Sequence, residues 1–341
     1  MKIWIDILTP KQLLFSEPII EKLGKKHEIL CTSREYREVI RIAKIRDFKI
    51  SVVGRHGGGD RNEKLNESIK RMSGLYSKIK KFSPDLVISY CSPEAARISF
   101  GLGIKHIAFC DSPHADAVMR LTLPLIQKLL IPKMIQKKEF SKYGINEKNI
   151  IQYNAIDAAV TIKRKMKNQN RIPFTKKKKN ILIRIEEEQA AYTSKSDIII
   201  PIIKKIISEF KNENILILGR YPKQIEQFKK ICGNSAKIIK MSYDGKQLLE
   251  KTDVFIGSGG TMTAESTLLG VPTISYNAIP NIIENYLVQK KMLKRETNPT
   301  KIARHMNRIF DRPDTSHKKR IKKIVNSMDS PIELLVKIIN Q

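Results

Sequence analysis

The sequence predicts an α/β protein with two doubly wound, parallel-sheet domains of similar size. In both halves, short apolar and β-branched runs alternate with longer segments of helical periodicity. A polar, basic stretch at 160–180 separates the two halves and is typical of a linker or an exposed loop. The length of 341 residues and the hydrophobic content of 41% suffice for two separate cores.

The first half contains five strand-like runs separated by amphipathic segments. Strands are expected at residues 2–8, 28–33, 49–54, 84–90 and 105–110, and helices at 13–27, 34–45, 64–82 and 92–103. Residues 121–135 are expected to be helical and then extended. Because each strand is followed by a helix, the strands are expected to be parallel, with helices on both faces of the sheet.

The alternation restarts after the basic stretch. Strands are expected at 181–185, 214–219, 237–241, 253–259 and 272–276, and helices at 198–210, 223–232, 244–252, 263–270 and 281–292. The tail from Pro299 is helical and basic. We therefore predict a Rossmann-like domain at 1–160, a basic linker at 161–179, a second Rossmann-like domain at 180–298 and basic C-terminal helices at 299–341. Ligands of two such domains are expected in a cleft between them.

The chain is strongly basic, with 64 Lys and Arg against 34 Asp and Glu and a formal charge of +30. Such a charge suits nucleic acid, anionic lipid or phosphorylated substrates. The basic residues are spread along a chain rich in Lys, Ile and Asn, as AT-rich coding produces, so we interpret composition bias as the main cause. No aromatic-interleaved basic sheet or DNA-binding module accompanies the charge, so specific nucleic-acid binding is not expected.

The sequence favours a cytoplasmic location. Met1 leads directly into a strand-like run, and no apolar run approaches roughly 18–20 residues, so neither a leader nor a membrane span is expected. The four cysteines show no CxxC pairing and are expected to be buried, reduced thiols. The six histidines are scattered, so no zinc site is expected.

The stretch "FIGSGGTMTAESTLLGVPTIS" at Phe255–Ser275 places glycines between a strand and a helix. Glycines there allow positive φ and close approach of a ligand to the backbone. Thr261 or Thr263 can cap the helix, and the N–H groups of its first turn form an anion site. Glu265, in the second turn, would repel a bare phosphate but could accept hydrogen bonds from a ribose. The turn therefore favours a nucleoside diphosphate, and the alternative is an ordinary turn that uses glycine for its geometry.

Two common phosphate-binding motifs are absent. Met262 stands where GxGxxG needs its third glycine. The glycines from Gly54 to Gly59 have P-loop spacing, but Asp60 and Arg61 replace Lys and Ser/Thr.

The loops at the carboxyl ends of the strands carry the candidate reactive groups. Asp111 and His114 follow the fifth strand, and a carboxylate next to an imidazole suits general base catalysis. The alternative is a turn with Asp as cap and an exposed His. Glu94 follows the fourth strand; as an acid in a first helical turn it also has a sufficient structural role.

Further residues are candidates for binding the substrate. Lys11 could meet a phosphate or be a solvated lysine, Arg97 lies one turn after Glu94, and His56 belongs to a glycine-rich loop that could close over a ligand. In the second half, Arg220 follows a strand and could pair with a diphosphate. Three consecutive glutamates at 186–188 are more typical of a solvated face than of a metal site.

The chain resembles, over nearly its whole length, the archaeal and bacterial domain-of-unknown-function family 354, which is grouped with GT-B glycosyltransferases and UDP-N-acetylglucosamine 2-epimerases. The stretches that carry the resemblance are "WIDILTPKQLLFSEPIIEKL", "VVGRHGG", "PDLVISYCSPEAARISFGLGI", "DSPHADAVMRLTLPL" and "DVFIGSGGTMTAESTLLGVPTIS". Residues 154–165 and 184–192 depart from the pattern of the family.

The resemblance implies a GT-B fold with a nucleotide-sugar site on the second domain and an acceptor site on the first. It implies diphosphate contacts from Ser258, Gly259, Gly260 and Thr261. Glu265, five residues before Gly270, would bind the ribose hydroxyls. No cofactor or metal is expected, because the nucleotide sugar is itself the substrate.

Three functions stay open. The first is metal-independent glycosyl transfer to a glycan or lipid-linked acceptor, with an anionic membrane surface as a further partner. The second is a nucleotide-sugar epimerase that uses Glu94, Asp111 and His114 as acid–base groups. The third is a non-enzymatic basic binding protein on the same fold.

Overall fold

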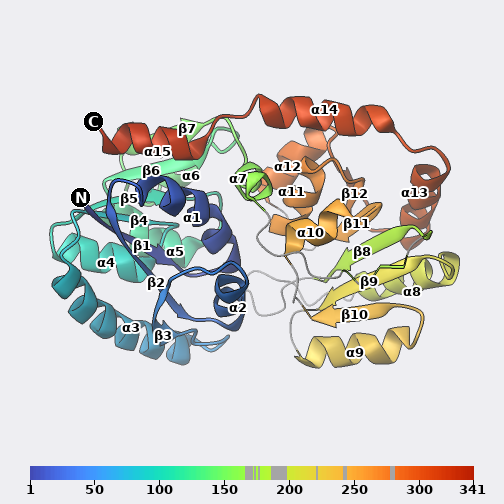
Figure 1. Cartoon of the computed structure of the whole chain (residues 1–341), viewed down its shortest axis with the longest axis horizontal. Helices are drawn as coiled ribbons and strands as arrows, with labels where there is room; N and C mark the ends of the chain where they lie inside the picture. The colour runs from blue at the N-terminus through green and yellow to red at the C-terminus, as the bar shows by residue number, and fades with distance from the viewer. Residues whose placement is uncertain are drawn as a thin grey trace. The chain divides into compact units, whose positions relative to one another are not determined.

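The computed structural model describes residues 1–165, 172, 174–175, 177–185, 198–219, 222–240, 244–276 and 281–341. The chain divides into two compact units. Unit 1 comprises Met1–Lys167 and Met328–Gln341, and unit 2 comprises Asn168–Ser327. Both units are α/β, with strands flanked by helices (Figure 1).

Unit 1 contains a seven-stranded sheet in the order β3-β2-β1-β4-β5-β6-β7, and all its strand pairs are parallel. Its elements are β1 (Lys2–Ile7), α1 (Pro10–Leu23), β2 (Glu28–Glu35), α2 (Arg37–Ile45), β3 (Ser51–Arg55), α3 (Arg61–Phe82), β4 (Leu86–Ser89), α4 (Pro93–Gly101), β5 (Lys105–Phe109), α5 (Asp116–Thr122), η1 (Leu123–Leu125), β6 (Lys128–Pro132), α6 (Lys138–Ser141), η2 (Glu147–Asn149), β7 (Ile150–Tyr153), α7 (Ala158–Lys163) and α15 (Pro331–Ile339). The strand order reverses between β1 and β4, which is where such sheets bind ligands.

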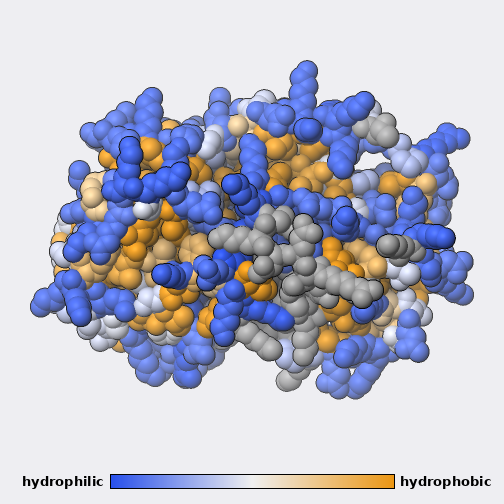
Figure 2. All heavy atoms as spheres, in the orientation of Figure 1, coloured by the Kyte–Doolittle hydropathy of each residue, from blue (hydrophilic) through white to orange (hydrophobic). Residues whose placement is uncertain are grey.

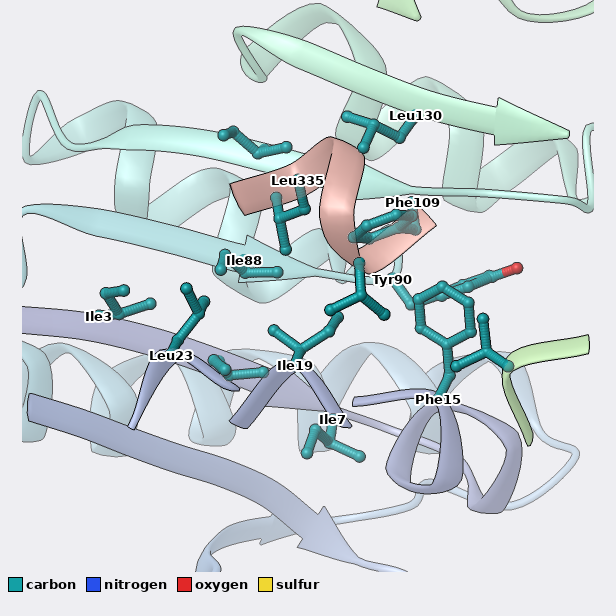
Figure 3. Close-up of a cluster of buried hydrophobic side chains, with 14 of the residues drawn as sticks. Ile3, Ile7, Phe15, Ile19, Leu23, Ile88, Tyr90, Phe109, Leu130 and Leu335 are labelled. Carbon is teal, nitrogen blue, oxygen red and sulfur yellow. The ribbon is translucent and has the colours of Figure 1, made fainter. Parts of the chain in front are cut away.

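The side chains of β1 alternate between two cores, because successive residues of a strand point to opposite faces. Ile3, Ile5 and Ile7 pack with α1, α2 and α15 on one face, whereas Trp4 packs with α3 and α4 on the other. Figure 3 shows that Leu335 of α15 lies among Ile88, Phe109 and Leu130, from three different strands. The last helix of the chain is therefore a component of the core of unit 1.

Unit 2 contains a six-stranded sheet in the order β10-β9-β8-β11-β12-β13, and its strand pairs are also parallel. Its elements are β8 (Asn180–Arg184), α8 (Ile199–Glu209), β9 (Asn214–Gly219), α9 (Pro222–Cys232), β10 (Lys237–Lys240), α10 (Gly245–Glu250), β11 (Val254–Gly257), α11 (Thr261–Leu268), β12 (Thr273–Ser275), α12 (Ile282–Gln289), β13 (Lys294–Arg295), α13 (Pro299–Asp311) and α14 (Thr315–Asn326). Here the strand order reverses between β8 and β11. The two doubly wound parallel sheets confirm the predicted fold class.

The structure also contains features that the sequence did not indicate. The two edge strands β7 and β13 were not predicted, and both are short. Residues 299–341, predicted as one group of basic helices, divide between the units: α13 and α14 belong to unit 2, and α15 belongs to unit 1.

The cysteines and the surface agree with the composition. Cys31, Cys91, Cys110 and Cys232 are all buried and free, as predicted. The face shown in Figure 2 is largely hydrophilic, with the apolar residues in separate patches. Within the described ranges, no helix combines the length and the apolar character needed to cross a membrane.

Candidate functional site

Lys11 lies at the point where the strand order of unit 1 reverses. It occupies the first turn of α1, whose cap is Thr9, and the loops after β4 and β5 surround it. Its ammonium donates to the Tyr90 hydroxyl at 2.8 Å, lies 4.5 Å from the centroid of that ring, and forms ion pairs with Asp111 and, at 3.3 Å, with Asp157. Lys11 is therefore not the freely solvated lysine that was its alternative.

Asp157 is a buried partner of Lys11, and it is only 1% exposed. Its carboxylate accepts hydrogen bonds from the hydroxyls of Tyr90 and Tyr153. Burial raises the pKa of Asp157 above its ordinary value, although Lys11 opposes the shift. Burial lowers the pKa of Lys11, but Asp111 and Asp157 outweigh it and hold this pKa above its ordinary value. We call Lys11, Tyr90, Asp111, Tyr153 and Asp157 the lysine–acid cluster.

Asp111 connects the lysine–acid cluster to the loop after β5, which carries His114. Its carboxylate accepts from Lys11 and, at 2.8 Å, from the Ser112 hydroxyl. His114 lies three residues further on and is exposed. Partial burial lowers the pKa of His114, the charge of Lys11 lowers it further, and the charge of Asp111 opposes both. The imidazole is therefore neutral at neutral pH and able to accept a proton.

Glu94 belongs to a second, buried group of charges. Arg71 of α3 pairs with Asp6 at 2.6 Å and with Glu94 at 3.3 Å, and all three side chains are less than one-tenth exposed. Glu94 also accepts from Ser68 at 3.0 Å, and Asp6 accepts from Ser92 at 2.6 Å. These contacts engage the carboxylate of Glu94 inside unit 1. The partners named here for Glu94 are not members of the lysine–acid cluster.

His56 and Arg97 lie outside both groups of contacts. The His56 ring stacks on Tyr36 with its centroid 5.2 Å away, and its Nδ1 accepts from the N–H of Gly58 at 3.0 Å. Arg97 is exposed on α4. The structure therefore does not bring either residue into the contacts made by Lys11 and Asp111.

The glycine turn of unit 2 follows β11, at the point where the order of that sheet reverses. Gly259 has a φ of +97°, and its N–H donates to the Thr263 hydroxyl at 3.2 Å. A Cβ atom on Gly257 would meet Thr263 Oγ1 at 2.4 Å, so the fold itself requires that glycine. At Gly260, by contrast, φ is −84° and a Cβ atom would meet no atom of the described residues within 4 Å. The space beside Gly260 is therefore open at the start of α11.

The predicted capping of α11 is wrong. The cap is Gly260, which has no side chain to cap the helix, and Thr261 and Thr263 are the first and third residues of α11. Because the backbone is extended at Gly260 and already helical at Thr261, the cap position falls on Gly260 and not on a threonine. Among the described residues, no side chain caps the N–H groups of this first turn, and such groups suit an anion.

Ser258, Glu265 and Arg220 complete the predicted nucleotide site. Ser258 lies in the turn and is 7% exposed, and Glu265 lies within α11 and is 6% exposed. Arg220 lies outside the described residues.

Asp157 and the two tyrosines are the site residues that sequence reasoning missed. Asp157 stands in the stretch that departs from the family pattern, and the short edge strand β7 before it was not predicted. Recognising β7 at Ile150–Tyr153 would have placed Asp157 at the carboxyl edge of the sheet.

Among the residues that the structure describes, no group of three His, Cys, Asp or Glu side chains could hold a metal ion.

Comparisons with known proteins agree with this architecture. The family described as "Protein of unknown function (DUF354)" matches residues 1–341. An uncharacterized protein of Methanocaldococcus jannaschii is 28% identical over 300 residues, which are 85% of this chain and 86% of that protein.

Solved structures with the same fold have lower sequence identity. A UDP-GlcNAc 2-epimerase from Neisseria meningitidis, bound to UDP-GlcNAc, has a TM-score of 0.75 at 14% identity and covers 99% of both chains. The M. jannaschii UDP-GlcNAc 2-epimerase, in complex with UDP-GlcNAc and UDP, has a TM-score of 0.64 at 15% identity, over 96% of this chain and 99% of that one. The spinosyn rhamnosyltransferase SpnG, complexed with spinosyn aglycone, has a TM-score of 0.63 at 11% identity, over 99% and 100%. The fold of this chain is that of GT-B epimerases and glycosyltransferases.

Proposed function

The chain belongs to the family "Protein of unknown function (DUF354)", and we propose that it is an enzyme acting on a nucleoside-diphosphate sugar. The observation that carries the proposal is the open, uncapped start of α11 beside Gly260, with Glu265 in the next turn. Backbone N–H groups and the helix dipole suit a diphosphate, and a carboxylate suits ribose hydroxyls. The complexes of the similar epimerases with UDP-GlcNAc support this class of ligand.

The reaction that we propose first is glycosyl transfer. His114 is exposed at the carboxyl edge of unit 1, and its lowered pKa keeps the imidazole unprotonated at neutral pH. His114 would take the proton of an acceptor hydroxyl as that oxygen bonds to the anomeric carbon. The anomeric C–O bond to the diphosphate breaks, and the N–H groups of α11 stabilise the charge on the leaving group. A glycan or lipid-linked acceptor fits this chemistry.

A second candidate reaction is epimerisation at C2 of the sugar, and the lysine–acid cluster favours it. This chemistry removes the C2 proton and returns one to the opposite face, so it needs several acid–base groups. Asp111, Asp157 and Tyr90 all contact Lys11 and supply such groups within one site. The similarity to UDP-GlcNAc 2-epimerases supports this candidate.

Incubation of the protein with UDP-sugars in heavy water, without any acceptor, distinguishes the two reactions. For a transferase, we expect no solvent deuterium at C2 of the recovered nucleotide sugar, as measured by mass spectrometry and proton NMR. For an epimerase, deuterium accumulates at C2 because the proton that returns comes from solvent. Deuterium at C2 would exclude glycosyl transfer as the main activity.

Glu265→Ala tests the nucleotide site directly. UDP-, GDP-, CDP- or TDP-sugars are expected to raise the melting temperature of the wild-type protein, and the variant is expected to lose this shift. Hydrogen bonds to a charged group contribute about 1.5–3 kcal/mol, so the affinity should fall at least roughly tenfold. The control is Glu250→Ala on α10, whose side chain is 44% exposed and whose variant should keep the shift. An unchanged shift in Glu265→Ala would remove the ribose assignment, and no shift with any nucleotide sugar would favour a non-enzymatic binding protein.

A further inference from the structure

A hollow of about 170 Å³ in unit 2 is lined mainly by basic side chains. The residues that line it are Lys294, Glu296, Lys301, Arg304, His305 and Arg308, and we call them the basic pocket. Lys294 belongs to β13 and Glu296 directly follows that strand. The other four residues come from α13, which is labelled in Figure 1. None of these residues belongs to the glycine turn.

The helical periodicity of α13 explains the pocket. Lys301, Arg304, His305 and Arg308 follow the spacing i, i+3, i+4, i+7 and therefore share one face of the helix. Ile302, Ala303 and Met306 are fully buried on the opposite face, in the core with α8. Core packing of α13 thus holds the basic face in a fixed position beside Lys294.

Among the described residues, no carboxylate forms a close ion pair with the cations of this pocket, although hydrogen bonds from Asn298 and Thr297 and the charges of Lys301 and Lys294 lower the pKa of Glu296. No ion pair within 4.0 Å joins Lys294, Lys301, Arg304 or Arg308 to an acid in that part of the chain. The carboxylate of Glu296 accepts the N–H groups of Thr297 and Asn298, both at 3.1 Å, at the start of α13.

Arg295, the neighbour of Lys294 on β13, is instead paired within the fold. It pairs with Glu284 at 3.0 Å and donates to Asn285 at 2.6 Å, so its charge is satisfied within the fold. The basic pocket instead gathers four permanent cations against one carboxylate. Like charges that share a site repel one another, and a bound anion would relieve this repulsion.

We propose that the basic pocket binds the phosphate group of a ligand, at a site separate from the nucleotide-sugar site. Two arginines offer planar, paired N–H donors that match phosphate oxygens, and two lysines add charge. A dianionic phosphate neutralises the cluster better than a single carboxylate does. The phosphate can belong to a soluble phosphate compound or to a lipid headgroup, since both present the same oxygens.

His305 provides a local reporter. It is half-buried, and burial together with the charges of Lys294 and Arg308 lowers its pKa. The other ionisable groups of the pocket are Lys301, Arg304 and Glu296. A phosphate bound among these groups would raise the pKa of His305, which NMR of the imidazole ring measures with and without inorganic phosphate.

The test compares Arg304→Gln/Arg308→Gln with the control Lys204→Gln/Lys229→Gln. Both double variants remove two positive charges from exposed positions of unit 2 and leave the glycine turn intact. We expect the affinity for inorganic phosphate and pyrophosphate, measured by calorimetry, to fall at least about tenfold in the arginine variant. Each hydrogen bond that is lost joins two charged groups. The control should stay within about twofold, since screened surface charges contribute little. The rise in the pKa of His305 with phosphate should also disappear only in the arginine variant.

Vesicles distinguish the two sources of phosphate. The wild-type protein and both variants are sedimented with phosphatidylcholine vesicles that contain or lack phosphatidic acid. Binding that requires phosphatidic acid and is lost only in Arg304→Gln/Arg308→Gln identifies a lipid phosphate, and binding of pyrophosphate alone identifies a soluble one. Equal weakening in the two double variants, or no phosphate binding by the wild-type protein, would overturn the proposal.

Discussion

Lys11→Met is expected to lower the free energy of unfolding by about 2–4 kcal/mol, slightly less than for a fully buried pair because Lys11 is partly exposed. The substitution keeps the length of the side chain but removes the ammonium that pairs with Asp111 and Asp157. Asp157 is then a buried carboxylate with only tyrosine hydroxyls as partners. Chemical denaturation at neutral pH, followed by circular dichroism, measures the loss.

The pH dependence identifies the cause of this loss. The folded-state pKa of Asp157 is already raised above 3.8, and removal of Lys11 raises it further. The stability loss should therefore grow as the pH rises through the raised folded-state pKa of Asp157, and should be smaller below that pKa, where Asp157 is protonated in both folded proteins. Adding Asp157→Asn should restore part of the stability at neutral pH. Lys22→Met, which removes the ion pair of Lys22 with the exposed Glu333, is the control and should cost less than about 1 kcal/mol.

Arg71→Met is expected to cost about 3–5 kcal/mol, the largest stability effect predicted for this chain. Arg71 is 1% exposed and forms ion pairs with both Asp6 and Glu94, and Arg34 contributes a further positive charge near them. The variant would leave two carboxylates buried on β1 and α4 without their arginine. Denaturant titration monitored through the buried Trp4, whose indole donates to Thr32 within this network, measures the effect.

The titration of Asp6 gives this variant its own signature. Burial raises the pKa of Asp6, but Arg71, with Ser92 and Thr32, outweighs burial and holds it below 3.8. In the wild-type protein, Asp6 thus contributes stability above pH 3.8 that is lost as the pH falls through its lowered pKa. In Arg71→Met, burial without Arg71 should raise the pKa of Asp6 above 3.8. The difference in the free energy of unfolding between the two proteins should therefore be largest at neutral pH and smallest in acid. Lys70→Met, at the adjacent exposed position, should change stability by less than about 1 kcal/mol. A deficit that does not change with pH would point to lost packing instead of lost charge pairing.

The sequence predicted the architecture because parallel strands buried on both faces are continuous apolar runs, as in β1, β4 and β11. It predicted less well at two sheet edges: β7 is as long as β4 and β11 but contains the polar Gln152, and β13 consists of only two residues, both basic. The turn at Gly257–Gly260 was also recognisable, because its glycines stand between a strand and a helix.

The partners of the candidate site were harder to predict. Lys11 was a candidate, but its contacts with Asp157 and Tyr90 join residues 146 and 79 positions apart, and no local pattern encodes such distances. Glu94 illustrates the opposite case: its position in a first helical turn was visible, whereas its buried partner Arg71 on α3 was not.

The return of α15 to unit 1 has a consequence for how the protein is made. A ribosome releases residues 1–167 long before Ile332, Leu335 and Ile338, so the nascent first unit lacks three of its core side chains until the second unit has been synthesised. The second unit, by contrast, is continuous in sequence, and its whole chain emerges before α15 does. We therefore expect vectorial synthesis to favour the order in which the second unit reaches its native packing before the first.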